Sequence, residues 1–211
     1  MKKALIFDWD GTIAHKELAT IAAVKQMNMM GMDVTIEKMH EFQKTHSHYD
    51  DVFSTMRKLV GNYDDSVIIP LTTNLFQFFY LETANKNPSE IFYKDMFDVL
   101  NELKKDYKLL IASNLRQDIL EPITEKYCPN LFDKVYANTP DLKYSKTDLV
   151  KKACDEYECI SMIGDREDDI NAGTRNDLET VIVSWGYRNG EKCNPTHRIE
   201  SPLELLKIYK L

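Results

Sequence analysis

The sequence predicts an α/β fold: a Rossmann-like parallel sheet with helices on both faces, into which an all-α domain is inserted. Residues from about 91 onward alternate between short apolar runs and segments of helical periodicity, which is typical of βα units. Residues 14 to about 84 contain no convincing strand and keep helical spacing. We therefore expect residues 1–14 and 89–211 to form an α/β core domain and residues 15–88 to form a separate helical domain.

The first strand is expected over Ala4–Phe7, an apolar run followed by two carboxylates one residue apart, Asp8 and Asp10. Gly11 comes next and allows the backbone to turn sharply. Two acids held so close repel each other unless a cation lies between them. This stretch therefore predicts a cation site at the tip of the first strand.

The helical block begins with helical spacing at Leu18, Ile21, Ala22, Val24 and Lys25. Further helices are expected over 35–45, 50–60 and 70–84. A methionine cluster in this block is interpreted as core filling rather than as a ligand surface; its members are Met27, Met29, Met30 and Met32.

The second part of the chain begins with a helix whose apolar face holds Met96, Val99, Leu100 and Leu103. A buried strand, KLLIASN, follows and ends in Ser113 and Asn114. The remaining elements are expected as a helix at 117–127, a strand at 134–138, a helix at 146–157, a strand at 159–164, a helix at 168–175 and the strand TVIVSW. Strands that alternate with helices in this way form parallel sheets.

Composition limits the class of protein. The chain has 211 residues, of which 43% are hydrophobic and 29% charged, so it can bury a core. The net charge of -7 argues against nucleic acid or an anionic membrane as the main partner. Neither a membrane span nor a signal peptide is evident, which favours a cytoplasmic location. The cysteines show no metal-binding spacing and are expected to be reduced structural thiols; they are Cys128, Cys154, Cys159 and Cys193.

Polar residues gather after the apolar strands, where ligands bind in parallel sheets. They are Asp8 and Asp10, then Ser113 and Asn114, then Lys143 and Lys146, and finally GDREDD at 164–169. Taken alone, GDREDD is more typical of a solvated acidic loop. A hairpin turn at Asp8 is disfavoured because no partner strand follows, and an EF-hand loop is disfavoured because its glycine and glutamate spacing is absent.

Four stretches, in their usual order, resemble the motifs of the haloacid dehalogenase (HAD) superfamily: FDWDGT at 7–12, IASN at 111–114, a lysine near 143–146 and MIGDREDDINAG at 162–173. The resemblance covers nearly all of residues 1–14 and 89–211. The inserted helical block looks like the mobile cap of the subclass that includes phosphoglycolate phosphatases, nucleotidases and β-phosphoglucomutases.

The C-terminal part is similar to the phosphoglycolate phosphatase and nucleotidase branch, through SKTDLVKKA, GDREDDINAG, VIVSWGYRNGEK and HRIESPLELLKIY. On that match Lys146 is the lysine of the third motif, and Lys143 is the runner-up. His15 stands where this branch usually has an acid, and this departure concerns the substrate more than the mechanism. We favour packing for His15, and a polar helix face rather than the site for His46 and His48.

Phosphoryl transfer needs positive charge and an in-line nucleophile. Asp8 is the candidate nucleophile, which forms an aspartyl-phosphate, and Asp10 is the candidate acid and base. The resemblance implies a magnesium ion (Mg²⁺) held by the side chains of Asp8 and Asp165 and by the backbone carbonyl of Asp10. Asp169, four residues after Asp165, is expected to reach the metal directly or through water, whereas Asp168 points elsewhere.

The transferring phosphoryl group is expected to contact Lys146, the Ser113 hydroxyl and the Asn114 backbone N–H, with Gly11 and Thr12 as donors on the opposite side. The function expected is hydrolysis of a small phosphorylated metabolite, phosphoglycolate first, by a monomer or homodimer. Nucleotidase, sugar phosphatase, pyrophosphatase and mutase activities stay open because substrate choice depends on the helical block. A dehalogenase is disfavoured because it has no use for Asp10 or magnesium. Phosphonate cleavage and a non-catalytic binding role are also disfavoured, the latter because every expected polar group is present.

Overall fold

The computed structural model describes residues 2–45, 64–187 and 193–210, and the chain divides into two compact units. The core unit comprises Met1–Lys16 and Pro88–Leu211, and the helical unit comprises Glu17–Asn87. Among the described residues, no helix combines the length and apolarity needed to cross a membrane.

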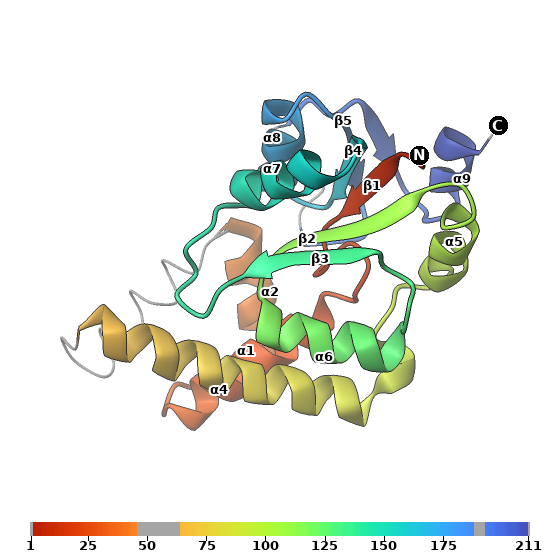
Figure 1. Ribbon diagram of the computed structural model, residues 1–211. Helices are drawn as coiled ribbons and strands as arrows, with labels where there is room; N and C mark the ends of the chain where they lie inside the picture. The colour runs from red at the N-terminus through yellow and green to blue at the C-terminus, as the bar shows by residue number, and fades with distance from the viewer. Residues whose placement is uncertain (1, 46–63, 188–192, 211) are drawn as a thin grey trace. The chain divides into compact units, whose positions relative to one another are not determined.

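The core unit is built on a six-stranded sheet of order β3-β2-β1-β4-β5-β6 (Figure 1). Its strands are β1 (Ala4–Phe7), β2 (Lys108–Arg116), β3 (Lys134–Asn138), β4 (Cys159–Gly164), β5 (Glu179–Val183) and β6 (His197–Ile199). Every neighbouring pair is parallel. This confirms the predicted α/β class, and it places β1 in the middle of the sheet, where its carboxyl end adjoins those of β2 and β4.

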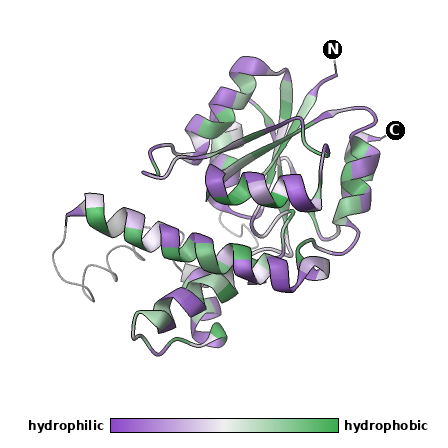
Figure 2. Cartoon of the chain, turned by 60° about the horizontal axis from the view of Figure 1, so that its bottom comes forward, coloured by the Kyte–Doolittle hydropathy of each residue, from purple (hydrophilic) through white to green (hydrophobic). Residues whose placement is uncertain are grey.

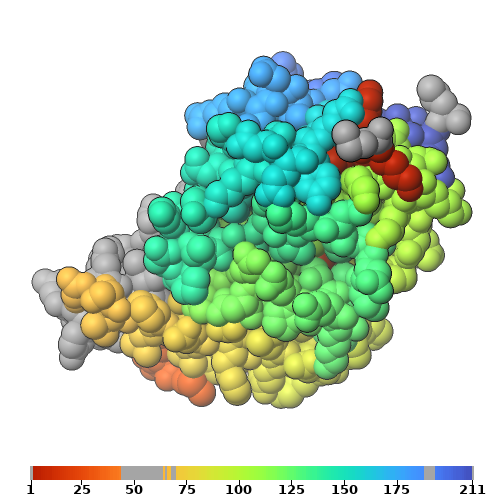
Figure 3. Space-filling view, viewed as in Figure 1, coloured from red at the N-terminus to blue at the C-terminus, as the bar shows by residue number. Residues whose placement is uncertain are grey.

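Helices cover both faces of this sheet. They are α5 (Met96–Leu103), α6 (Gln117–Tyr127), α7 (Lys146–Glu156), α8 (Glu167–Arg175) and α9 (Glu204–Tyr209). α7 and α8 lie over one face and α6 over the other (Figure 1), and α7 and α8 form the outer layer of the core unit in the space-filling view (Figure 3). Buried side chains of β1, β2 and β4 pack with those of α7 and α8, and green segments mark this apolar core in Figure 2.

Most predicted elements of the core unit are present, with three differences. β2 continues two residues beyond Asn114 to Arg116, and its register with β3 shifts there. The last predicted strand ends at Val183 rather than at Trp185. β6 and α9 were not predicted, because segments of three and six residues carry too few positions to show a period.

The helical unit contains α1 (Glu17–Met29), α2 (Ile36–Thr45) and α4 (Asp65–Lys86). α4 begins five residues earlier than predicted, with Pro70 inside it, because Asp64 caps the helix by accepting from the Ser66 N–H at 2.8 Å. The helix predicted at 50–60, and with it His46 and His48, lies outside the described residues. The methionine cluster is only partly core, since Met27 is buried but Met29 is 65% exposed.

Candidate active site

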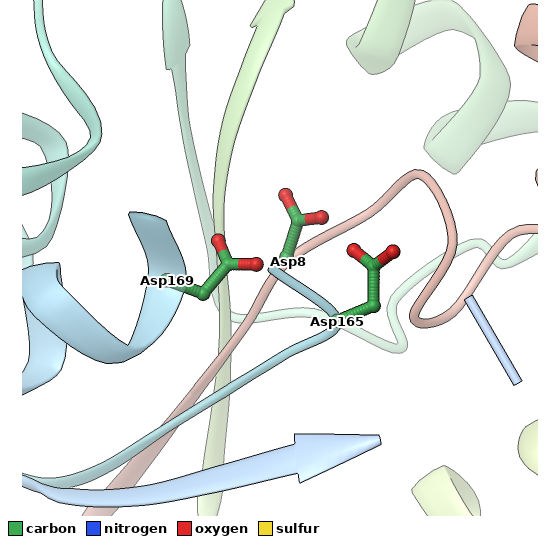
Figure 4. A group of neighbouring side chains, drawn as sticks. All are labelled: Asp8, Asp165 and Asp169. Atoms are coloured by element: carbon green, nitrogen blue, oxygen red, sulfur yellow. The ribbon is translucent and has the colours of Figure 1, made fainter. Parts of the chain in front are cut away.

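Three buried carboxylates meet at the carboxyl edge of the sheet. Asp8 follows β1, Asp165 follows β4, and Asp169 lies in the first turn of α8. One carboxylate oxygen of each lies within 4.8 Å of the others. Figure 4 shows the three carboxylates directed to the same side, with Asp8 between the other two in that view. The structure therefore brings together three of the four predicted metal ligands through their side chains.

The backbone around this acid cluster is shaped for close approach. Gly11 has a φ of +85°, and a Cβ atom there would lie 2.7 Å from Oδ2 of Asp165. The following turn is closed by the Trp9 carbonyl, which accepts from the N–H groups of Ile13 and Ala14 at 3.0 and 2.9 Å. The sharp turn that Gly11 predicted is thus what brings the segment after β1 against Asp165.

Lys146 is the cation of the site. It is the first residue of α7, directly after a capping box formed by Ser145 and Asp148. Its buried Nζ donates to Oδ1 of Asp8 and, at 3.0 Å, to the Ala112 carbonyl of β2.

The same Lys146 Nζ lies 3.0 Å from Oδ1 of Asp169. Lys143, the alternative from the sequence, is exposed and lies over the Tyr144 ring at 5.6 Å. The structure therefore places Lys146, and not Lys143, among the acids.

Lys146 and Arg166 together carry less charge than the three buried acids. Burial raises the pKa of the Asp8 carboxyl to about 6, although the Lys146 ammonium opposes the shift. Burial also raises the pKa of Asp165 to about 8, against the effect of Arg166 and with the help of Asp169 and Asp8. For Lys146, burial works to lower the pKa, but the two neighbouring carboxylates raise it above its ordinary value. The site thus has an excess of negative charge that a further cation would relieve.

The donor atoms fit a magnesium ion. Oδ1 of Asp165 is buried and accepts no hydrogen bond from the residues that the structure describes. Buried oxygen atoms without partners are costly unless a ligand satisfies them. Carboxylate oxygens are the ligands that hard divalent cations such as Mg²⁺ prefer. Asp8, Asp165 and Asp169 would hold such an ion.

The other predicted site residues lie at the same edge of the sheet. Asp10 is half-buried in the turn after β1. The N–H groups of Gly11 and Thr12 donate within this turn, to Ala14 at 2.9 Å and to Trp9 at 3.3 Å. Thr12 is fully buried, and its hydroxyl has no hydrogen-bond partner in the described part of the chain. The hydroxyl is therefore the group that Thr12 has available for a ligand.

Ser113 and Asn114 lie near the end of β2. The Ser113 hydroxyl is buried and accepts from the Leu115 N–H at 3.2 Å. The Asn114 side chain donates to Asp168 at 3.4 Å. Asp168, the acid that the sequence placed outside the metal site, thus holds Asn114 rather than joining the acid cluster. The phosphate-binding role of these residues stays a prediction.

Tyr187 is a residue of this site to which the sequence analysis assigned no role, although it lies in the quoted stretch VIVSWGYRNGEK. Its backbone N–H donates to Oδ2 of Asp165 at 2.6 Å, and its ring lies under the Arg166 guanidinium at 4.6 Å. A backbone N–H group is present in almost every residue type, so the pattern of residue types does not predict which residue donates to Asp165. His15, which we expected to pack, stacks on Tyr93 with ring centroids 4.6 Å apart.

Comparison with known proteins shows the family to which the chain belongs. A family model described as haloacid dehalogenase-like hydrolase matches residues 5–183. The phosphoglycolate phosphatase of Aquifex aeolicus (strain VF5) is 24% identical over 98% of this chain and 96% of its own length.

Two solved structures share the fold at low sequence identity. A predicted phosphatase from Clostridium acetobutylicum has a TM-score of 0.76 at 20% identity, and the match covers 100% of both chains. The HAD-hydrolase YfnB of Bacillus subtilis, described as bound to magnesium, has a TM-score of 0.70 at 17% identity over 100% of this chain and 99% of its own. Since the family model spans most of the sequence, the chain belongs to the haloacid dehalogenase-like hydrolase family.

Proposed function

We propose that this chain is a magnesium-dependent phosphatase that hydrolyses a small phosphomonoester through an aspartyl-phosphate. The observation that carries the proposal is the buried cluster of Asp8, Asp165 and Asp169, with the Lys146 ammonium on the Asp8 carboxylate. This cluster would supply a nucleophile, cation ligands and a fixed positive charge at one point. Phosphoryl transfer needs those three parts, because its main requirements are positioning and charge stabilisation.

Asp8 is the nucleophile of the first step. A carboxylate oxygen of Asp8 attacks phosphorus, and the bond from phosphorus to the ester oxygen breaks. Lys146 orients Asp8 through its hydrogen bond and offsets charge on the phosphoryl oxygens. When bound, magnesium would neutralise further charge on the carboxylates and on the phosphate.

Asp10 serves both steps as the proton carrier. Its carboxyl gives a proton to the leaving alkoxide as the ester bond breaks. The resulting Asp10 carboxylate then takes a proton from the water that attacks the aspartyl-phosphate. The bond from phosphorus to the Asp8 oxygen breaks, inorganic phosphate leaves and both carboxyl groups return to their starting states.

The phosphoryl oxygens would be held by Lys146, by the hydroxyls of Ser113 and Thr12, and by donors near Asn114. The unpartnered, fully buried Thr12 hydroxyl supports this assignment, since a bound oxygen would satisfy it. Ser113 offers a hydroxyl hydrogen while its oxygen accepts from Leu115.

The helical unit is proposed to act as a cap that excludes water and selects the leaving group. Its helices lie between two segments of the core in the sequence, so that the chain crosses between the units twice. The description of the YfnB structure as revealing interdomain movement supports such a role. A phosphoglycolate-like substrate is proposed on the similarity to the phosphoglycolate phosphatase of Aquifex aeolicus.

The test is phosphate release from phosphoglycolate, nucleoside monophosphates, sugar phosphates and pyrophosphate, with magnesium and with a chelator. We expect magnesium-dependent release that is highest on one small phosphomonoester, and loss of release in Asp8→Asn. Asp155→Asn is the matched control, because Asp155 is an exposed acid of α7 paired with Lys151 at 3.1 Å. Release by Asp8→Asn at the wild-type rate would overturn the proposed nucleophile.

A further inference from the structure

The loop after β5, Ser184 to Tyr187, contacts two functional points of the core unit and is called the 184–187 loop. One point is Asp165 of the acid cluster. The other is Lys16, the last residue of the core unit before the chain enters the helical unit at Glu17. The proposed mechanism assigns nothing to this loop.

The loop fixes one oxygen of Asp165. The Tyr187 N–H donates to Oδ2 at 2.6 Å. Gly186 allows this approach, because a Cβ atom at that position would lie 2.3 Å from the same oxygen. With Oδ2 bound in this way, Oδ1 is the oxygen of Asp165 left for a cation. Movement of the loop would therefore move a proposed metal ligand.

The same loop holds the backbone at the chain exit. The Tyr187 hydroxyl donates to the Lys16 carbonyl at 2.9 Å, and the Lys16 ammonium donates back to the Gly186 carbonyl at 3.0 Å. The Lys16 N–H donates at 3.2 Å to the hydroxyl of Tyr93, which in turn donates to the Trp185 carbonyl at 3.2 Å.

A further bond joins the loop to the segment between β1 and Lys16. The Trp185 indole N–H donates to the Thr12 carbonyl at 3.1 Å. The exit segment is therefore tied to the 184–187 loop at both of its ends, Thr12 and Lys16. Tyr187 is the residue that joins the two sides, with its N–H on the acid cluster and its hydroxyl on the exit.

We propose that Tyr187 is a positioning residue that couples the metal-binding state of Asp165 to the conformation of the chain exit at Lys16. The proposal rests on the proposed function for the identity of the metal. Coupling between two sites is reciprocal. A cation bound at Asp165 would therefore stabilise the conformation of the chain at Lys16, and the bonds at Lys16 would in turn favour the position of Asp165 that binds the cation. The two-sided contact of one rigid aromatic residue is what transmits the effect.

Tyr187→Phe tests this coupling, because it removes the hydroxyl bond to Lys16 and keeps the backbone bond to Asp165. Hydrogen–deuterium exchange of peptides covering residues 12–20 is measured with and without magnesium, and magnesium affinity is measured by calorimetry. In the wild type, magnesium is expected to slow exchange at the exit severalfold. In Tyr187→Phe, the slowing of exchange by magnesium at the exit should be lost, and magnesium affinity should fall by no more than the same severalfold factor, because the coupling acts equally on both sites.

Tyr107→Phe is the matched control. It removes the same kind of bond, from a tyrosine hydroxyl to the Tyr209 carbonyl at 2.9 Å, at the opposite end of β2 from the acid cluster. It should retain the wild-type protection by magnesium. Lys16→Met, which removes the bond to Gly186, is the second variant and should lose part of that protection.

Equal protection by magnesium in Tyr187→Phe and in the wild type would overturn the coupling. Magnesium binding without any change in exchange at residues 12–20 of the wild type would also overturn it, and would leave the proposed function standing. Absence of magnesium binding by the wild type would overturn the proposed function and the coupling together. Calorimetry therefore separates the two failures.

Discussion

Magnesium affinity is expected to rise steeply with pH. Burial raises the pKa of Asp165 to about 8 and that of Asp8 to about 6 in the metal-free protein. A cation binds these groups as carboxylates, so it must displace the protons that they hold. Because both pKa values are raised, the displaced protons are most numerous at low pH, and affinity falls as the pH falls.

The two pKa values set the size of the effect. At about pH 8, Asp165 is about half protonated and Asp8 is ionised, whereas at about pH 6 Asp165 is almost wholly protonated and Asp8 about half. Proton competition therefore weakens magnesium binding about 100-fold over this range, or about 2.7 kcal/mol. At about pH 7, about one proton should be released for each ion bound.

Calorimetry in two buffers that differ in ionisation enthalpy measures both the affinity and the protons released. Asp155→Asn, which alters an exposed acid 62% open to solvent, should keep the wild-type pH dependence. A change in affinity of less than about threefold between about pH 6 and about pH 8 would refute the reasoning. It would mean that the acid cluster is ionised without metal despite its burial.

Three further predictions concern stability and turnover. Lys146→Met should reduce turnover at least about 100-fold and lower the free energy of unfolding of the metal-free protein by about 3–5 kcal/mol, because it leaves the buried acids without their partner. Denaturant unfolding and single-turnover assays check this, and the exposed Lys151→Met should change either quantity little. Gly11→Ala should lower the free energy of unfolding by more than about 2 kcal/mol, because the added Cβ atom strains the backbone and contacts Asp165. Gly31→Ala should lower it by about 1 kcal/mol, because Gly31 has a similar φ of +86° but its Cβ atom would meet no atom within 4 Å. Equal losses in the two glycine variants would contradict the close approach at Gly11. Finally, the free energy of unfolding of the metal-free protein should fall as the pH rises from about 4 to about 8, by about 1.4 kcal/mol per pH unit for each proton that the folded state holds in excess, and saturating magnesium should flatten this slope in thermal unfolding scans.

Strong periodicity made much of the core unit predictable. The four apolar positions of α5 named from the sequence are the four that the structure buries, because a 3.6-residue period leaves one face for the core. The bounds of β3 and β4 also agree with the sequence, since each is an apolar run between polar segments. In such segments the pattern of apolar residues predicts which positions are buried, and the acids that follow them predict the carboxyl edge of the sheet.

Other features of the fold and the site depend on tertiary contacts, which the periodicity of the sequence does not predict. The predicted helix began at Pro70, but Asp64 caps the helix five residues earlier and α4 continues through the proline. The choice between Lys143 and Lys146 was open by spacing, although the Ser145 cap with Asp148 three residues later fixes where α7 begins. The contact of Tyr187 with Asp165 uses a backbone N–H and could not be predicted from residue types.

The position of Lys146 also bears on whether the chain can fold without a metal. Its ammonium joins Asp8 after β1, the Ala112 carbonyl of β2 and Asp169 of α8, and so links three segments that lie far apart in the sequence. This internal counterion is part of the chain itself, so we expect the core unit to fold before any metal binds, in contrast to domains that are unfolded without theirs. On the proposed function, magnesium would bind a site that is already formed, and it would add to the stability of that site as well as serve the chemistry. We therefore expect a shortage of metal to lower the rate of turnover more than it lowers the amount of folded protein.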